Sequence, residues 1–241
     1  MLAVDSTEQV GPHLVRVVLS GDSLAEFGGD GHTDAYVKLQ FTDPEQRPVT
    51  RTYTVRWIDR AARRLAIDFV THGDTGIAAV WAMKASPGDE LVLSGPGGGY
   101  APNPATAWHV FAGDLSALPA ISAALEALPA DAQGAAWLEV AAPDDILDLK
   151  CPTGVALNWL VNPDFDDTAF LARAVDGGPW PDPSTVQVFV HGERESVKAI
   201  RAVLRTREVP REAISISGYW ARGRTEDVFQ AEKREPIGKI E

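Results

Sequence analysis

This sequence has little cysteine, and it lacks metal-ligand clusters, long apolar runs and a net positive charge. Its 241 residues include one cysteine, Cys151, which excludes an internal disulfide and a multi-cysteine metal site. The five histidines lack the spacing of metal ligands. No window approaches the roughly 18 apolar residues of a membrane-spanning helix, and no export signal begins the chain. We therefore expect a cytoplasmic protein without a metal site or membrane insertion.

The charge is negative overall and unevenly distributed. A formal net charge of −12 argues against nucleic acid as a partner. Residues 104–191 contain 2 Lys/Arg against 12 Asp/Glu, whereas residues 47–64 contain 6 Arg against the single Asp59. This basic segment in an acidic chain suits a small anionic ligand. The alternative is that its arginines decorate a hairpin turn, which we favour for Arg60, Arg63 and Arg64.

The segment Arg51–Arg56 is central to the interpretation. Apolar and polar residues alternate through it, which favours a strand with Arg51 and Tyr53 on one face and Thr54 on the other. A cation, a flat ring and small hydrogen-bonding groups together match the needs of a flavin nucleotide. An ordinary barrel strand with exposed arginines explains the hexapeptide equally well, because short motifs often match by chance.

The first half of the chain has the pattern of an antiparallel barrel. Asp74-Thr75-Gly76 can cap a helix over Ile77–Lys84, whose start suits a phosphate or pyrophosphate. The glycine run Gly97–Gly99 lacks the spacing of a dinucleotide-binding fingerprint, and we interpret it as a hinge or a close backbone passage. Strands are expected over Leu14–Leu19, Ala35–Phe41, Arg51–Trp57, Leu65–Val70 and Leu91–Leu93.

The second half alternates strand and helix, which indicates an α/β unit with a parallel sheet. We place the domain boundary at Pro102–Pro104, giving a barrel domain over 1–103 and a nucleotide-binding-like domain with a C-terminal helix over 104–241. Ligands of such sheets bind at the carboxyl ends of strands, where Gly113-Asp114 and Gly192-Glu193 fall. Strands are expected over Val110–Ala112, Trp137–Val140, Val186–Val190 and Ile214–Ile216, with helices burying Leu118, Ile121, Leu125 and Leu128, and Val197, Ile200, Val203 and Leu204.

Several ordered blocks resemble one family of flavoenzymes. They are Arg51–Arg56, Asp68–Gly73, Trp81-Ala82 with Pro87–Asp89, Gly113-Asp114 with Ala117–Ala120, and Ser217–Trp220 with Gly223. Together they resemble the siderophore-interacting proteins, FAD-containing ferric-siderophore reductases of the ferredoxin-reductase-like class. The resemblance runs from about residue 10 to 235.

The resemblance implies binding residues on both halves of the chain. For FAD they are Arg51, Tyr53, Thr54, Val55, Asp68, Val70, His72, Gly76, Ala78 and Ala79. For the nicotinamide nucleotide they are Asp114, Ser116, Pro119, Gly192 and Glu193. The chain departs from the family pattern at Leu115-Ser116, where Glu-Thr is expected, and at Ile77, where proline is expected. The first departure concerns the nicotinamide site more than the flavin site.

The implied reaction is electron transfer from NADPH or NADH, or from a reduced ferredoxin-type protein, through FAD to the Fe(III) of a ferric siderophore. A flavin is required because the nicotinamide gives a hydride whereas iron accepts single electrons. No catalytic acid–base residue is needed, and we identify none. Lys38, Arg56, Arg222 and Lys233 are candidates for holding the anionic chelate, although each also fits an ordinary solvated charge.

Two other functions are compatible with the sequence. One is a general flavin or quinone reductase on the same scaffold, and the other is a siderophore-binding protein without a redox role. We expect a monomer in each case.

Overall fold

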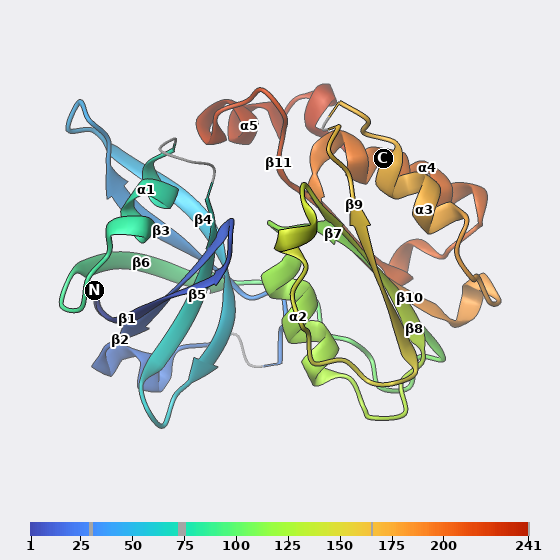
Figure 1. Ribbon diagram of the computed structural model, residues 1–241, viewed down its shortest axis with the longest axis horizontal. Coiled ribbons are helices and arrows are strands. Elements are labelled where there is room, and N and C mark those ends of the chain that lie inside the picture. The colour runs from blue at the N-terminus through green and yellow to red at the C-terminus, as the bar shows by residue number, and fades with distance from the viewer. Residues whose placement is uncertain (29–30, 72–75, 165, 241) are drawn as a thin grey trace. The chain divides into compact units, whose positions relative to one another are not determined.

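A computed structural model describes residues 1–28, 31–71, 76–164 and 166–240 (Figure 1). The chain divides into two compact units, one comprising Met1–Ala101 with Ser122–Ala124 and the other the remaining residues. The first contains a closed antiparallel barrel and the second a parallel sheet with helices, which confirms the predicted fold class. Within the described ranges, no helix is long and apolar enough to cross a membrane.

The barrel strands follow the order β1-β2-β5-β4-β3-β6, and β6 pairs with β1 to close the sheet. Side chains of β3 point alternately into the barrel and outward: Val37 and Leu39 are fully buried, whereas Lys38 between them is exposed. The barrel strands are β1 Leu2–Gly11, β2 Leu14–Ser20, β3 Tyr36–Thr42, β4 Pro48–Asp59, β5 Arg64–Val70 and β6 Glu90–Gly97.

Helix α1, Ile77–Lys84, has the predicted bounds and packs on the barrel core. The ring of Trp81 lies 5.6 Å from Phe41 and 5.8 Å from Phe69, measured between centroids. The small residues Ala78 and Ala82 are buried, so the helix backbone approaches the barrel closely. The helix therefore contributes to the core of the first unit.

The glycine run passes close to another strand, as one of the two predicted alternatives required. A Cβ on Gly97 would lie 2.3 Å from the Tyr36 ring. Gly98 has φ +141, and its Cβ would lie 3.0 Å from the Ala35 backbone. Glycine is required at Gly98, because of its positive φ and the nearby backbone, whereas a side chain at Gly97 would displace the exposed Tyr36 ring.

The sheet of the second unit has the order β11-β10-β7-β8-β9, with every neighbouring pair parallel. Helices α3 and α4 pack on one face and α2 covers the other (Figure 1). Residues Val188–Val190 are fully buried, as expected for a strand covered on both faces. The elements are β7 Trp108–Asp114, α2 Leu118–Ala127, β8 Gly134–Val140, β9 Val155–Val161, α3 Phe170–Asp176, β10 Val186–Glu193, α4 Arg194–Thr206, β11 Ile214–Trp220 and α5 Glu226–Glu232.

Candidate functional site

Strand β4 carries the proposed flavin-binding residues of the barrel. Arg51 and Tyr53 pair with Leu39 and Val37, which are fully buried, so both point to the interior side of the sheet. Tyr53 is half-buried, and its ring lies 4.4 Å from that of Phe69. Because Phe69 also contacts Trp81, these rings connect β4 to α1.

The next two residues of β4 are buried. Thr54 is 7% exposed and pairs with Tyr36 on the outer face, as the predicted alternation required. Val55 is 6% exposed and precedes an irregularity in the pairing with β5. The strand thus presents its ring and its hydroxyl on opposite faces.

Asp68 on β5 is held by arginines of neighbouring strands. Its carboxylate is buried and accepts hydrogen bonds from Arg16 at 2.6 and 2.8 Å. Arg56, with a side chain 12% exposed, lies 4.0 Å from the same carboxylate. This geometry makes Asp68 a structural anchor of the barrel and directs Arg56 toward it. Val70, at the end of the strand, is half-buried.

Helix α1 starts at a glycine with positive φ. Gly76 has φ +84, and a Cβ there would meet no described heavy atom within 4 Å. Among the described residues, no side chain caps the helix. The small first-turn residues Ala78 and Ala79 add little bulk, so a pyrophosphate fits the local chemistry. His72, Asp74 and Thr75 lie outside the described residues.

On the second unit, Asp114 joins the carboxyl ends of β7, β10 and β11. Its Oδ1 accepts hydrogen bonds from the N–H of Ser116 at 2.9 Å and from the hydroxyl of Ser116 at 2.5 Å. Its Oδ2 accepts from the N–H of Glu193 and from Trp220 Nε1, both at 2.8 Å. Gly192 is required here, because its φ is +141 and a Cβ would lie 2.8 Å from this oxygen. The carboxylate is therefore committed to contacts within the chain.

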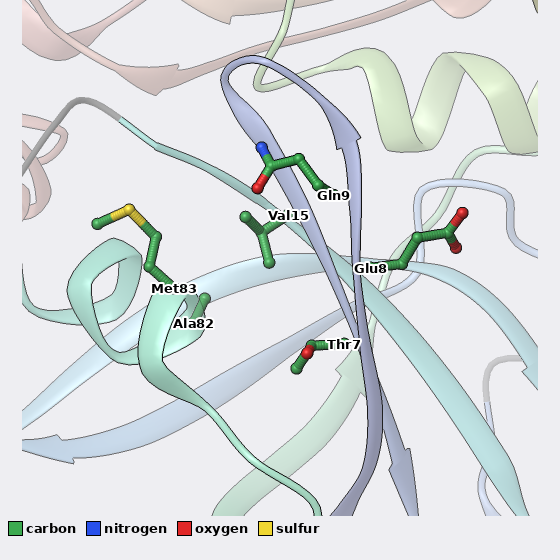
Figure 2. A pocket seen from close by; sticks show the side chains of 6 residues that line it. All are labelled: Thr7, Glu8, Gln9, Val15, Ala82 and Met83. Atoms are coloured by element: carbon green, nitrogen blue, oxygen red, sulfur yellow. The ribbon is translucent and has the colours of Figure 1, made fainter.

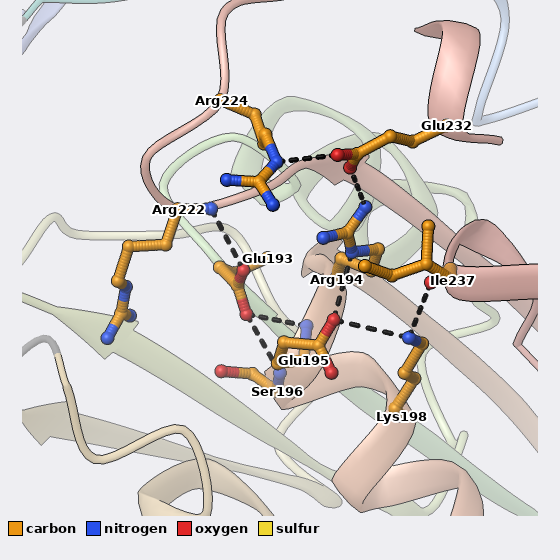
Figure 3. Close-up of polar contacts among 9 residues, drawn as sticks. All are labelled: Glu193, Arg194, Glu195, Ser196, Lys198, Arg222, Arg224, Glu232 and Ile237. Atoms are coloured by element: carbon orange, nitrogen blue, oxygen red, sulfur yellow. Dashed lines mark hydrogen bonds and ion pairs between the residues drawn. The ribbon is translucent and has the colours of Figure 1, made fainter. Parts of the chain in front are cut away.

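Both side-chain oxygens of Glu193 also accept hydrogen bonds from the chain itself. It is 3% exposed and caps α4, accepting from the N–H groups of Glu195 at 2.7 Å and Ser196 at 2.9 Å (Figure 3). Its other oxygen accepts from the N–H of Arg222 at 3.1 Å. Asp114 and Glu193 thus form one chain of contacts that ends at the backbone of Arg222.

The structure brings together most of the predicted nucleotide residues of the second unit. Asp114, Ser116, Gly192 and Glu193 meet at one edge of the sheet. Pro119 lies in the first turn of α2, as predicted. The indole of Trp220 was not assigned a role from sequence, because its hydrogen bond depends on the pairing of β10 with β11.

Glu139, at the end of β8, was also missed. It is half-buried, and burial is the main cause of its raised pKa. Asn162, which is 3% exposed, donates to Glu139 Oε1 at 2.7 Å. Its place at a strand end was the available sequence signal.

The candidate chelate-binding cations differ in their surroundings. Lys38 is exposed on β3 and pairs with Thr52 of β4. The guanidinium of Arg222 lies 3.8 Å from Asp166. Lys233 lies 4.7 Å from the Phe229 ring centroid, and burial lowers its pKa. These placements leave their contact with a chelate a prediction.

His191 lies on β10 and is 5% exposed. Its ring stacks on Phe189 at 4.0 Å, and its Nε2 lies 3.1 Å from the hydroxyl of Ser215. Burial lowers the pKa of His191 to about 3, and the nearby charge of Lys233 acts in the same direction. The imidazole is therefore neutral at physiological pH.

Helix α5 is held by a network of charged residues (Figure 3). Arg194, which is 5% exposed, pairs with Glu232 at 2.5 Å and with Glu195 at 2.9 Å. Arg224 also binds Glu232, at 2.6 Å. The network connects α5 to the start of α4 and to the loop after β11.

A small pocket of about 290 Å³ lies in the first unit, between the β1–β2 hairpin and α1 (Figure 2). None of its lining residues is among those proposed to bind flavin. Its lining residues are Thr7, Glu8, Gln9, Val15, Ala82 and Met83.

An antiparallel barrel followed by an α/β unit with a parallel sheet is the ferredoxin-reductase-like fold. Consistent with this class, the structure of the ferredoxin reductase in carbazole 1,9a-dioxygenase matches with a TM-score of 0.72 over 91% of this chain and 68% of that chain. Its sequence identity is 17%, so the likeness concerns the fold alone.

Family models narrow the assignment. The siderophore-interacting FAD-binding domain matches residues 3–47 and 41–100, and the siderophore-interacting protein model matches residues 106–223. The chain belongs to the siderophore-interacting protein family.

Two members are similar over nearly their full lengths. Ferric vibriobactin reductase ViuB of Vibrio cholerae is 37% identical, over 93% of this chain and 90% of the relative. The crystal structure of the siderophore-interacting protein SipS from Aeromonas hydrophila is 34% identical, with a TM-score of 0.87 over 99% of this chain and 97% of that one. These likenesses support an oxidoreductase with an FAD-binding domain.

Proposed function

We propose that the protein is an FAD-dependent ferric-siderophore reductase that takes electrons from NADH or NADPH, with a reduced ferredoxin-type protein as the alternative donor. The observation that carries the proposal is the connection of β4 to α1. The Phe69 ring contacts both Tyr53 and Trp81, so the strand bearing Arg51 and helix α1 belong to one packed unit. The identity of ViuB as a ferric vibriobactin reductase supports the same reaction.

Each barrel residue would contact a different part of FAD. Arg51 offers a positive charge to the pyrophosphate, and the first turn of α1 offers N–H groups. Tyr53 offers a ring for stacking, and the Thr54 hydroxyl offers a hydrogen bond. Bound FAD supplies the conversion of a two-electron donor into single-electron steps.

The overall reaction conserves electrons and charge. One NADH or NADPH and two ferric chelates give the oxidised nucleotide, one proton, two ferrous ions and the two freed chelators. Iron(III) in an anionic oxygen chelate is held tightly and Fe(II) weakly, so reduction releases the metal. Exposed cations, among them Lys38 on the barrel, would hold the chelate.

Flavin identity and electron acceptor test this proposal. Heat or acid release followed by chromatography should yield FAD. The protein, reduced anaerobically with dithionite, should be reoxidised by a ferric siderophore while a ferrous-specific chromogenic chelator develops colour. Reoxidation by quinones or free flavin alone would indicate a general reductase, and a colourless protein that binds ferric siderophore would indicate a binding protein.

A further inference from the structure

Glu139 is a fixed carboxylate with one oxygen available. Its Oε1 accepts a hydrogen bond from Asn162 at 2.7 Å. Asn162 is itself fixed, because its N–H donates to Val140 at 2.8 Å and the residue is 3% exposed. Within the described residues, no hydrogen bond reaches Glu139 Oε2. The arrangement orients an acceptor whose second oxygen has no hydrogen-bond partner among the described residues.

The strand order places Glu139 next to the point where dinucleotides bind to parallel sheets of this kind. In the order β11-β10-β7-β8-β9, the direction of strand succession reverses between β7 and β10. Dinucleotides bind across the carboxyl ends of such strands, and an acidic residue at the end of the next strand accepts the hydroxyls of the adenosine ribose. Glu139 lies at the end of β8, directly beside Asp114 in the register with β7.

The charges around Glu139 disfavour a phosphate on that ribose. The sequence contains no Lys or Arg from residue 101 to residue 149. The turn Pro143–Asp145, which follows β8, adds two more aspartates. Arg222 is a cation close enough to act on Glu139, but its guanidinium lies 3.8 Å from Asp166, whose charge partly balances it. The negative charges of Asp114 and Asp167 also act on Glu139.

We propose that Glu139 binds the ribose 2′- and 3′-hydroxyls of the nicotinamide donor and makes the protein prefer NADH over NADPH. This inference rests on the proposed function, because it assumes a nucleotide donor. A carboxylate accepts a hydrogen bond from the 2′-hydroxyl of NADH and repels the 2′-phosphate of NADPH. Asn162 acts on the donor only through Glu139 and is a positioning residue.

Calorimetry on the holoprotein with 5′-AMP and 2′,5′-ADP tests the ribose contact without turnover. Wild type should bind 5′-AMP more tightly by roughly tenfold or more, the worth of a hydrogen bond to a charged group. Glu139→Gln should narrow this ratio, since it keeps the shape and the Asn162 contact. Glu139→Lys should reverse it. In anaerobic flavin reduction, NADH should be preferred over NADPH by wild type and less so by Glu139→Gln.

Asp131→Asn is the matched control, because it makes the same change of charge in the exposed loop before the amino end of β8. It should keep the wild-type ratio. Equal or tighter binding of 2′,5′-ADP by wild type, or an unchanged ratio in Glu139→Gln, would overturn the assignment. Absence of binding by both probes would also overturn it. None of these results affects reoxidation of the dithionite-reduced protein by ferric siderophore, which tests the proposed function separately.

Discussion

At the scale of single residues, the acidic groups of the second unit act mainly through the backbone. Asp114 and Glu193 match the family pattern for nucleotide binding, yet their oxygens accept hydrogen bonds from the chain itself. Such charge-assisted bonds hold the strand ends in fixed positions. Their contribution to nucleotide binding is therefore best understood as positioning, with direct contact remaining a prediction.

Replacing Asp114 with Asn should destabilise the protein. The substitution replaces one carboxylate oxygen with an amide nitrogen, which cannot accept a hydrogen bond. Either the donors of Ser116 or those of Glu193 and Trp220 therefore lose their acceptor. We expect a loss of about 1–3 kcal/mol in the free energy of unfolding, measured by denaturant titration. Ser116→Ala, which removes only the hydroxyl contact, should cost less. An Asn variant as stable as wild type would contradict this role.

Replacing Tyr53 with Ala should weaken FAD binding. The substitution removes a stacking surface worth on the order of 1 kcal/mol, so the dissociation constant should rise several-fold. Fluorescence titration of the apoprotein with FAD measures the change. Tyr53→Phe keeps the ring and its contact with Phe69, and should bind nearly as wild type. Unchanged affinity in the Ala variant would remove Tyr53 from the site.

His191 should make the protein sensitive to acid. Its pKa is about 3 in the folded protein and about 6.5 in the unfolded chain, so the unfolded state binds more protons between these values. The free energy of unfolding should therefore fall as pH decreases from 6.5, with a contribution on the order of 2 kcal/mol at pH 5. His191→Phe should flatten the pH dependence between about pH 7 and pH 4. Ser215→Ala, which removes the hydroxyl contact without removing a titrating group, should keep the wild-type slope.

At the scale of secondary structure, clear alternation predicted the barrel strands, and the strands that were missed lack it. The strand Ala35–Phe41 alternates cleanly, and β3 follows it within one residue. No prediction covered β1, because only its first residues alternate in burial and most of the following ones are polar. β9 was missed for a similar reason: it is an edge strand, and most of its residues are half-buried. The short helix α3 was also missed.

The candidate site shows a similar division. Strand ends could be located from sequence, so Asp114 and Glu193 were correctly placed at the ends of two strands. Their partners could not, since the indole of Trp220 reaches Asp114 only after β10 and β11 pair in register. Glu139 required knowledge of the strand order, which local patterns do not contain. Sequence thus identified the edge of the sheet, and the fold identified which oxygens remain available.

Helix α5 should depend on Glu232 for its docking. Arg194 is buried, and Glu232 balances its charge together with Glu195. The hydrogen bond from Arg194 is the main cause of the lowered pKa of Glu232. In Glu232→Gln, amide exchange in α5 should accelerate by roughly tenfold or more, because a buried cation loses its partner charge. Hydrogen exchange with mass spectrometry measures this, and Glu235→Gln, an exposed change just past the helix, should have no such effect.

At the scale of the whole molecule, the net charge of −12 opposes an anionic substrate. Attraction of a ferric siderophore must therefore come from local cations, and Lys38 is an exposed cation on β3, which pairs with the flavin strand. Screening weakens such attraction, since the Debye length falls to about 10 Å at 0.1 M salt. The KM for the ferric siderophore should rise with ionic strength.

Lys38→Glu should raise the KM for the ferric siderophore several-fold, because an exposed charge contact is worth roughly 1 kcal/mol or less. Reduction of the flavin by the nucleotide donor should remain near wild type, since that step precedes contact with the chelate. Lys150→Glu provides a matched control: it makes the same charge change at an exposed position on the second unit and so separates local attraction from net charge. Steady-state reduction at low and high salt compares the variants. If both raise KM equally, net charge alone governs the encounter. If neither changes it and salt has no effect, Lys38 does not contact the chelate.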